Sequence, residues 1–97
     1  MKQGEFTAQL ATRRGCWRLY VVLLNTTEQW PERDFGRSVP VPTRTERAEA
    51  LRALGFEPVP GAEWRWIEDS ETPEDPASPV LLIAATTVRM TRMGGAS

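Results

Sequence analysis

Four segments of the chain have the hydrophobic pattern of β-strands. Residues 5–11 alternate apolar and polar side chains, which is typical of a strand with one face on the core. Residues 17–24 and 80–89 are apolar on both faces, and this pattern predicts central strands that are covered on both sides. Residues 63–68 form a shorter predicted strand that carries two tryptophans on one face. The first of the four strands is expected at an edge of the sheet.

Residues 43–55 form the one clear helix that the sequence predicts. Thr43 and Glu46 have the spacing of a capping box, in which each side chain pairs with a backbone N–H of the first turn. Gly55 can adopt the left-handed conformation that ends a helix. The charged residues of this segment, Arg47 among them, are expected to face water. The residues predicted to face the sheet are Ala48, Leu51 and Leu54.

Two long loops separate these elements. Residues 25–42 place large apolar side chains among prolines, and they predict an ordered, extended wrap with at most a short edge strand near Val39. Residues 69–79 are acidic and rich in proline, and their low hydrophobicity predicts mobility. The tail at 90–97 is expected to be flexible.

Together these patterns predict a single α+β domain over residues 1–97 with the element order ββαββ. If the two doubly apolar strands lie in the middle, the four-stranded antiparallel sheet has the order 1-2-4-3, with the helix packed on one face. The other face then needs a cover. The 25–42 loop, a second copy of the chain or a different partner could supply it.

Composition narrows the range of functions. The chain carries 12 basic and 13 acidic residues and no histidine, and Cys16 is its one cysteine. Histidine-based catalytic triads and an internal disulfide are therefore excluded. No concentrated basic face predicts nucleic-acid binding, and no apolar run approaches the roughly 20 residues that span a membrane. With no secretory signal pattern at the N-terminus, we expect a cytoplasmic protein.

Few residues of the sequence suggest a ligand-binding, metal-binding or catalytic role. Trp64 and Trp66, with Arg65 between them, could form a platform on which a ligand stacks, although nearby acids favour packing in the core or at an interface. The acidic residues 68–75 lack the glycine and the spacing of a calcium loop, so a solvated hairpin loop is favoured. Cys16 has no accompanying base. We expect no catalytic residue, metal or cofactor.

Two resemblances add to this interpretation. Residues 17–22 (WRLYVV), 30–37 (WPERDFGR), 53–58 (ALGFEP) and 61–66 (GAEWRW) resemble blocks of small streptomycete proteins that form a domain-of-unknown-function family. This resemblance implies an actinobacterial origin and no particular activity. Residues 25–31 are similar to the strand-to-loop region of MbtH-like proteins, small partners of adenylation domains in peptide synthetases. The chain lacks that family's later tryptophan-acid motif and adds a hairpin, so the similarity suggests only a type of partner.

The sequence therefore favours a non-enzymatic module that binds a protein partner or a second copy of itself, with no nucleic-acid or membrane partner. The alternative is a small-molecule or anion-binding protein, with a pocket between the 25–42 loop and Trp64 and Trp66. The expected interface combines an apolar sheet face with two anchors from the loop. Its candidate residues are Tyr20, Val22, Leu24, Leu81 and Ile83 on the sheet, with Trp30 and Phe35 in the loop.

Overall fold

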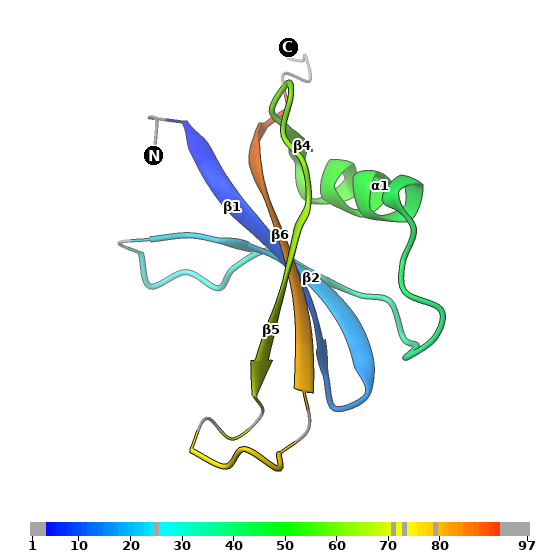
Figure 1. Ribbon diagram of the computed structural model, residues 1–97. Helices are drawn as coiled ribbons and strands as arrows, with labels where there is room; N and C mark the ends of the chain where they lie inside the picture. The colour runs from blue at the N-terminus through cyan, green and yellow to red at the C-terminus, as the bar shows by residue number, and fades with distance from the viewer. Residues whose placement is uncertain (1–3, 25, 71, 73, 79, 92–97) are drawn as a thin grey trace.

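The computed structural model describes residues 4–24, 26–70, 72, 74–78 and 80–91. This part of the chain contains six strands and one helix (Figure 1). In chain order these are β1 (Glu5–Arg13), β2 (Cys16–Val22), β3 (Glu32–Asp34), α1 (Arg44–Leu54), β4 (Phe56–Pro58), β5 (Arg65–Ser70) and β6 (Val80–Met90).

The strands form one antiparallel sheet that is strongly curled, like half of a barrel (Figure 1). Its order is β3-β2-β1-β6-β4, and β5 pairs with β6 alongside this path. The four predicted strands correspond to β1, β2, β5 and β6, so their observed order is 2-1-4-3. The predicted order 1-2-4-3 is wrong. β1 is a central strand, because Thr7 lies opposite both Val22 of β2 and Thr87 of β6.

The error has a physical cause in how β2 is covered. The second apolar face of β2 is protected by the loop that follows it, where the Trp30 ring stacks on the Tyr20 ring, and this face therefore needs no layer of secondary structure. β1 tolerates a polar outer face in a central position because its Gln9 amide oxygen accepts a hydrogen bond of 2.6 Å from the Tyr20 hydroxyl.

The ends of α1 are as predicted. The Thr43 hydroxyl accepts a hydrogen bond from the Glu46 N–H, and the Glu46 carboxylate accepts one from the Thr43 N–H. Gly55 follows the helix with a φ of 94°, in the left-handed region. The buried stripe is rotated from the predicted one, however. Arg47 is buried together with Ala50 and Leu51, whereas Ala48 is half-buried.

The core lies between α1 and one face of the sheet. Ala8 and Leu10 of β1 and Leu19 of β2 are fully buried there, and Leu51 of α1 packs into the same cluster with Leu54 at its margin. We call this the helix face of the sheet and the opposite one the outer face. The remaining buried members of the cluster are Trp17, Val21, Ala50, Phe56, Ala84 and Val88.

The 25–42 loop has its short strand at β3, and the expectation of a strand near Val39 is wrong. β3 pairs with β2, and the Arg18 guanidinium of β2 lies 3.0 Å from the Glu32 carboxylate and 3.4 Å from that of Asp34. Val39 directly precedes Pro40, which has no backbone N–H to donate to a neighbouring strand, and Val39 is exposed. The predicted flexible tail falls, from residue 92 onward, outside the described residues.

Candidate protein-interaction surface

The outer end of the β5–β6 hairpin extends beyond α1, although Arg47 of α1 still contacts Trp66. α1 packs against β2, β3 and β4, and β5 is held by its pairing with β6 from Arg65 opposite Ala85 to Ser70 opposite Val80. Large apolar side chains of this hairpin are open to solvent. Their exposed fractions are 45% for Trp66, 57% for Ile67, 60% for Val80 and 44% for Leu82.

Both faces of the hairpin carry these side chains. Ile67 lies opposite Ile83 on the outer face, whereas Trp66 lies opposite the buried Ala84 and therefore belongs to the helix face. Leu82 shares the helix face with Trp66 by the same alternation. The free side of β5 has no strand partner among the described residues. The hairpin thus offers apolar side chains and an unpaired backbone edge together.

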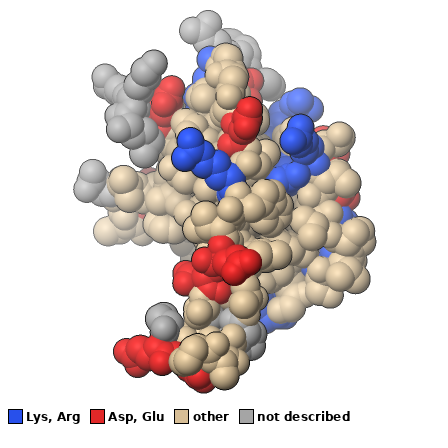
Figure 2. Space-filling model, viewed as in Figure 1, with Lys and Arg blue, Asp and Glu red and all other residues tan. Residues whose placement is uncertain are grey.

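Charged residues alternate with these apolar positions along β5. Arg65 and Asp69 lie on the outer face on either side of Ile67, and Glu68 lies on the helix face next to Trp66. Figure 2 shows acidic side chains gathered over β5 and the loop that follows it, and basic side chains gathered over α1. The hairpin surface is therefore apolar with charges of both signs at fixed positions.

The rings of Trp64 and Trp66 both lie against the positively charged side chain of Arg47. The Arg47 guanidinium lies 4.8 Å from the centre of the Trp64 ring and 5.9 Å from that of Trp66. The Arg47 Nε donates to the Thr43 carbonyl at 3.2 Å, whereas Nη1 is buried without a hydrogen-bond partner among the described residues. Burial lowers the pKa of Arg47, and the charge of Arg44 lowers it further. Trp66 also makes an edge-to-face contact with Trp17, with ring centres 6.1 Å apart.

A second exposed aromatic group lies on the outer face at β2. The Trp30 and Tyr20 rings stack with centres 6.1 Å apart, and the Trp30 indole N–H donates to the Leu23 carbonyl at 2.8 Å. Burial raises the pKa of Tyr20, and the charge of Arg13 partly offsets this. Ligand sites typically have volumes of about 300–1,000 Å³, and the hollow here measures about 780 Å³. It is lined by Arg13, Tyr20, residues 27–30 and Glu32.

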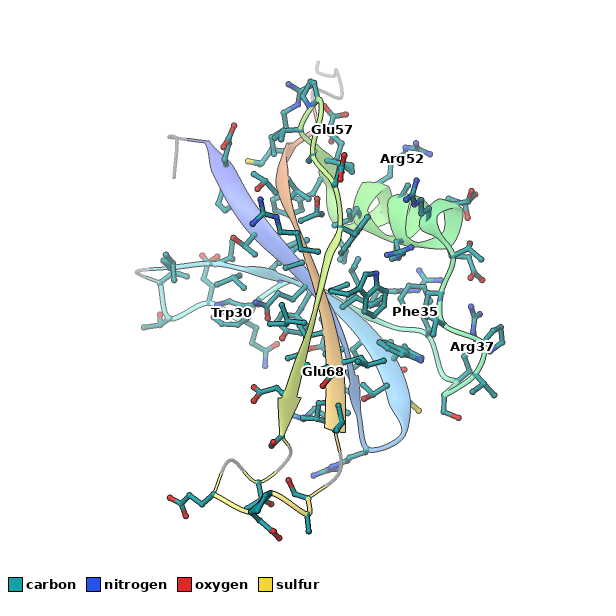
Figure 3. The ribbon with its side chains drawn as sticks, in the orientation of Figure 1. Trp30, Phe35, Arg37, Arg52, Glu57 and Glu68 are labelled. Carbon is teal, nitrogen blue, oxygen red and sulfur yellow. The ribbon has the colours of Figure 1, made fainter. Side chains whose placement is uncertain are left out.

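The structure separates the predicted interface residues into groups. Tyr20 and Val22 lie on the outer face of β2, next to Trp30, and the exposed Leu24 follows that strand. Leu81 and Ile83 lie on the outer face of β6, and the polar outer face of β1 separates them from β2. The last predicted member is on the other side of the sheet (Figure 3). It is Phe35, which packs against the core.

Sequence reasoning missed the exposed members of the hairpin. The pattern of residues 80–89 predicted burial of both faces, yet Val80 and Leu82 are exposed because the eleven-residue helix does not reach the end of β6. Ile67 was not among the interface residues predicted from the sequence. The signal that could have identified all three is their position beside the acidic, proline-rich loop, which marks the outer end of a hairpin.

Other kinds of site are not seen in the described part of the chain. No three carboxylate or thiol side chains converge there in a way that could hold a metal ion. α1, the helix described, is too short and too polar to cross a membrane.

The fold defines the class of this protein as mostly β, α+β, with a single helix on a six-stranded antiparallel half-barrel. The chain belongs to a family of unknown function, DUF6303, whose sequence model matches residues 4–96. Searches of curated proteins and of solved structures give no match. Family membership confirms the predicted domain-of-unknown-function assignment. The streptomycete origin and the similarity to MbtH-like proteins stay predictions.

Proposed function

We propose that this protein is a non-enzymatic protein-binding module and that the β5–β6 hairpin is its binding surface. The observation that carries the proposal is the exposure of Trp66, Ile67, Val80 and Leu82 on one hairpin with a free edge. Large apolar side chains that are exposed among polar residues are typical of protein interfaces, and aromatic residues are enriched in them. A partner that packs on the hairpin would remove these side chains from water.

The predicted interface residues fit this proposal in part. Leu81 and Ile83 extend the hairpin surface on its outer face, and Tyr20 with Trp30 supplies a second aromatic patch from the 25–42 loop. The partial similarity to MbtH-like proteins favours the same kind of task, namely binding to another protein. A cytoplasmic location and an actinobacterial origin belong to the same proposal.

A photo-cross-linking amino acid at position 67 tests the proposal directly. Placed in the full chain and expressed in the cells that naturally contain it, a benzoyl-phenylalanine at this position should form covalent adducts with protein. The matched control carries the same group at Glu49, an exposed position of α1. Equal adduct formation from positions 67 and 49 would contradict a binding surface on the hairpin.

The alternative, a small-molecule or anion-binding protein, is favoured by the 780 Å³ hollow beside Tyr20 and Trp30. Its proposed position at Trp64 and Trp66 is less favourable, because Arg47 already lies against both rings. Trp30→Ala and Trp66→Ala distinguish the two positions when wild type and variants are titrated with inorganic phosphate and with an aromatic sulfonate dye. Loss of binding with unchanged stability in Trp30→Ala would support the hollow, whereas no binding by the wild type contradicts the alternative.

A further inference from the structure

We propose that β5 pairs with β5 of a second copy of this chain, antiparallel and centred on Ile67, and that the two copies form a closed two-fold dimer. The inference rests on the proposed protein-binding function and names the partner for the same hairpin. It starts from the free backbone edge of β5, which faces no other described strand. Such an edge is a ready template for a further strand.

Charge complementarity selects this register. In an antiparallel pair centred on Ile67, Arg65 lies opposite the partner's Asp69, and Asp69 opposite the partner's Arg65. These side chains and Ile67 share the outer face of the sheet, where directly opposed side chains interact. The two-fold axis repeats the contact, so one interface contains the oppositely charged pair twice.

Neighbouring registers do not place Arg65 opposite the partner's Asp69. Centring the pair on Glu68 sets that carboxylate against its own copy, which is unfavourable for like charges. Centring it on Trp66 sets Arg65 opposite the partner's Ile67 and carries Asp69 past the start of the partner's β5. The charges that discourage indiscriminate edge pairing therefore permit one specific arrangement.

The same register also places Ile67, the more exposed of the two large apolar side chains of β5, beside its own copy. Ile67 lies opposite Ile83 within one copy, so the dimer places Ile83, Ile67, the partner's Ile67 and the partner's Ile83 in one row across the outer face. The acidic loops that follow β5 lie at opposite ends of an antiparallel pair, so their carboxylates do not face each other. Because each copy uses its β5 edge once, the assembly closes at two and does not continue as a fibre.

Exchanging the charges at Arg65 and Asp69 tests the proposed pairing. Arg65→Asp alone sets two aspartates opposite each other at both contacts, and Asp69→Arg alone does the same with two arginines. We expect each single variant to dimerise about tenfold more weakly than the wild type, or weaker still. An equimolar mixture of the two variants restores both oppositely charged pairs, so a mixed dimer should form with nearly wild-type affinity.

Light scattering after size-exclusion chromatography, with native mass spectrometry to recognise the mixed dimer, measures these outcomes on the full chain. Circular dichroism confirms that the variants fold, and Glu49→Arg on α1 is a control for a charge change away from β5. A wild type that is monomeric over about a hundredfold range of concentration overturns the inference. A wild-type dimer without recovery in the mixture overturns it as well.

Failure of the dimer is distinguishable from failure of the proposed function. If position 67 cross-links to a different protein while the purified chain stays monomeric, self-pairing is wrong and a protein-binding hairpin is retained. If the purified chain is monomeric and position 67 gives no more adducts than position 49, both are wrong.

Discussion

At the scale of single residues, Arg47 shows how a charged side chain can serve as part of a core. It is buried, its guanidinium lies against Trp64, and no carboxylate forms an ion pair with it among the described residues. Its methylene stem fills space between α1 and the tryptophans, while its buried Nη1 without a hydrogen-bond partner has a cost. We expect packing and the contact with the rings to outweigh that cost.

Arg47→Ala is therefore expected to lower the free energy of unfolding by about 2–3 kcal/mol, because it removes the stem and the cation–π contact together. Arg47→Met keeps most of the volume and relieves the unpaired buried nitrogen, and a cost of about 1 kcal/mol or less is expected. Urea unfolding followed by tryptophan fluorescence measures both. Equal losses in the two variants would show that the charge, and not the packed stem, holds the tryptophans.

Glu46 links the helix cap to the 25–42 loop. The Arg37 Nη2 lies 2.6 Å from its carboxylate, which also accepts the Thr43 N–H. The hydrogen bond from Arg37, and next that from the Thr43 backbone, lower the pKa of Glu46 from an ordinary 4.5 to about 2. Since the folded pKa is the lower one, ionised Glu46 stabilises the fold fully above about pH 4.5, and this stabilisation is lost as the pH falls towards about 2.

Glu46→Gln should consequently reduce the free energy of unfolding at about pH 6, and the difference from the wild type should shrink as the pH approaches about 2. Urea unfolding of both proteins at several pH values in this range tests whether the difference in free energy of unfolding shrinks towards low pH. The matched control is Glu49→Gln on the same helix, at an exposed position without an ion pair among the described residues. A difference that grows towards low pH would contradict the assignment.

At the scale of elements, signals contained in a short stretch of sequence were predictive and pairings between distant strands were not. Thr43, Glu46 and Gly55 located α1 because caps depend on residues within one turn. The position of β1 depends on which strands reach its two edges, and residues 5–11 look the same in either case. The exposed hairpin was missed for a related reason, since the reach of α1 over the sheet is a property of packing.

Hydrogen exchange tests the strand order that the sequence did not predict. In a central antiparallel strand every amide is hydrogen-bonded, whereas alternate amides of an edge strand point to solvent. Consecutive amides from Thr7 to Ala11 of β1 should therefore all exchange slowly in NMR experiments, and those of β5 should alternate between slow and fast in the monomer. Fast exchange at alternate positions of β1 would show that β1 is an edge strand.

At the scale of the whole molecule, one short helix cannot cover a sheet of six strands. α1 covers the core over β2, β3 and β4, and the Trp30 side chain covers part of the outer face. The outer end of the β5–β6 hairpin extends beyond both, with Val80 and Leu82 exposed. The chain measures 50 × 29 × 27 Å, with the loop after β5 at one end of the ribbon (Figure 1). This incomplete cover is the reason for proposing a binding function.

If the folded chain pairs with a second copy, stability and association are linked. Pairing that occurs only between folded chains adds about 2.7 kcal/mol at a concentration a hundred times the dissociation constant. For a domain of this size about 1 kcal/mol corresponds to roughly 4–8 °C in Tm, so the wild-type Tm should rise by several degrees on a hundredfold increase in protein concentration. Ile67→Glu sets two carboxylates opposite each other at the centre of the pair, and its Tm should be independent of concentration. Differential scanning calorimetry of both proteins decides this, because a wild-type Tm as constant as that of Ile67→Glu is incompatible with dimerisation of the folded chain.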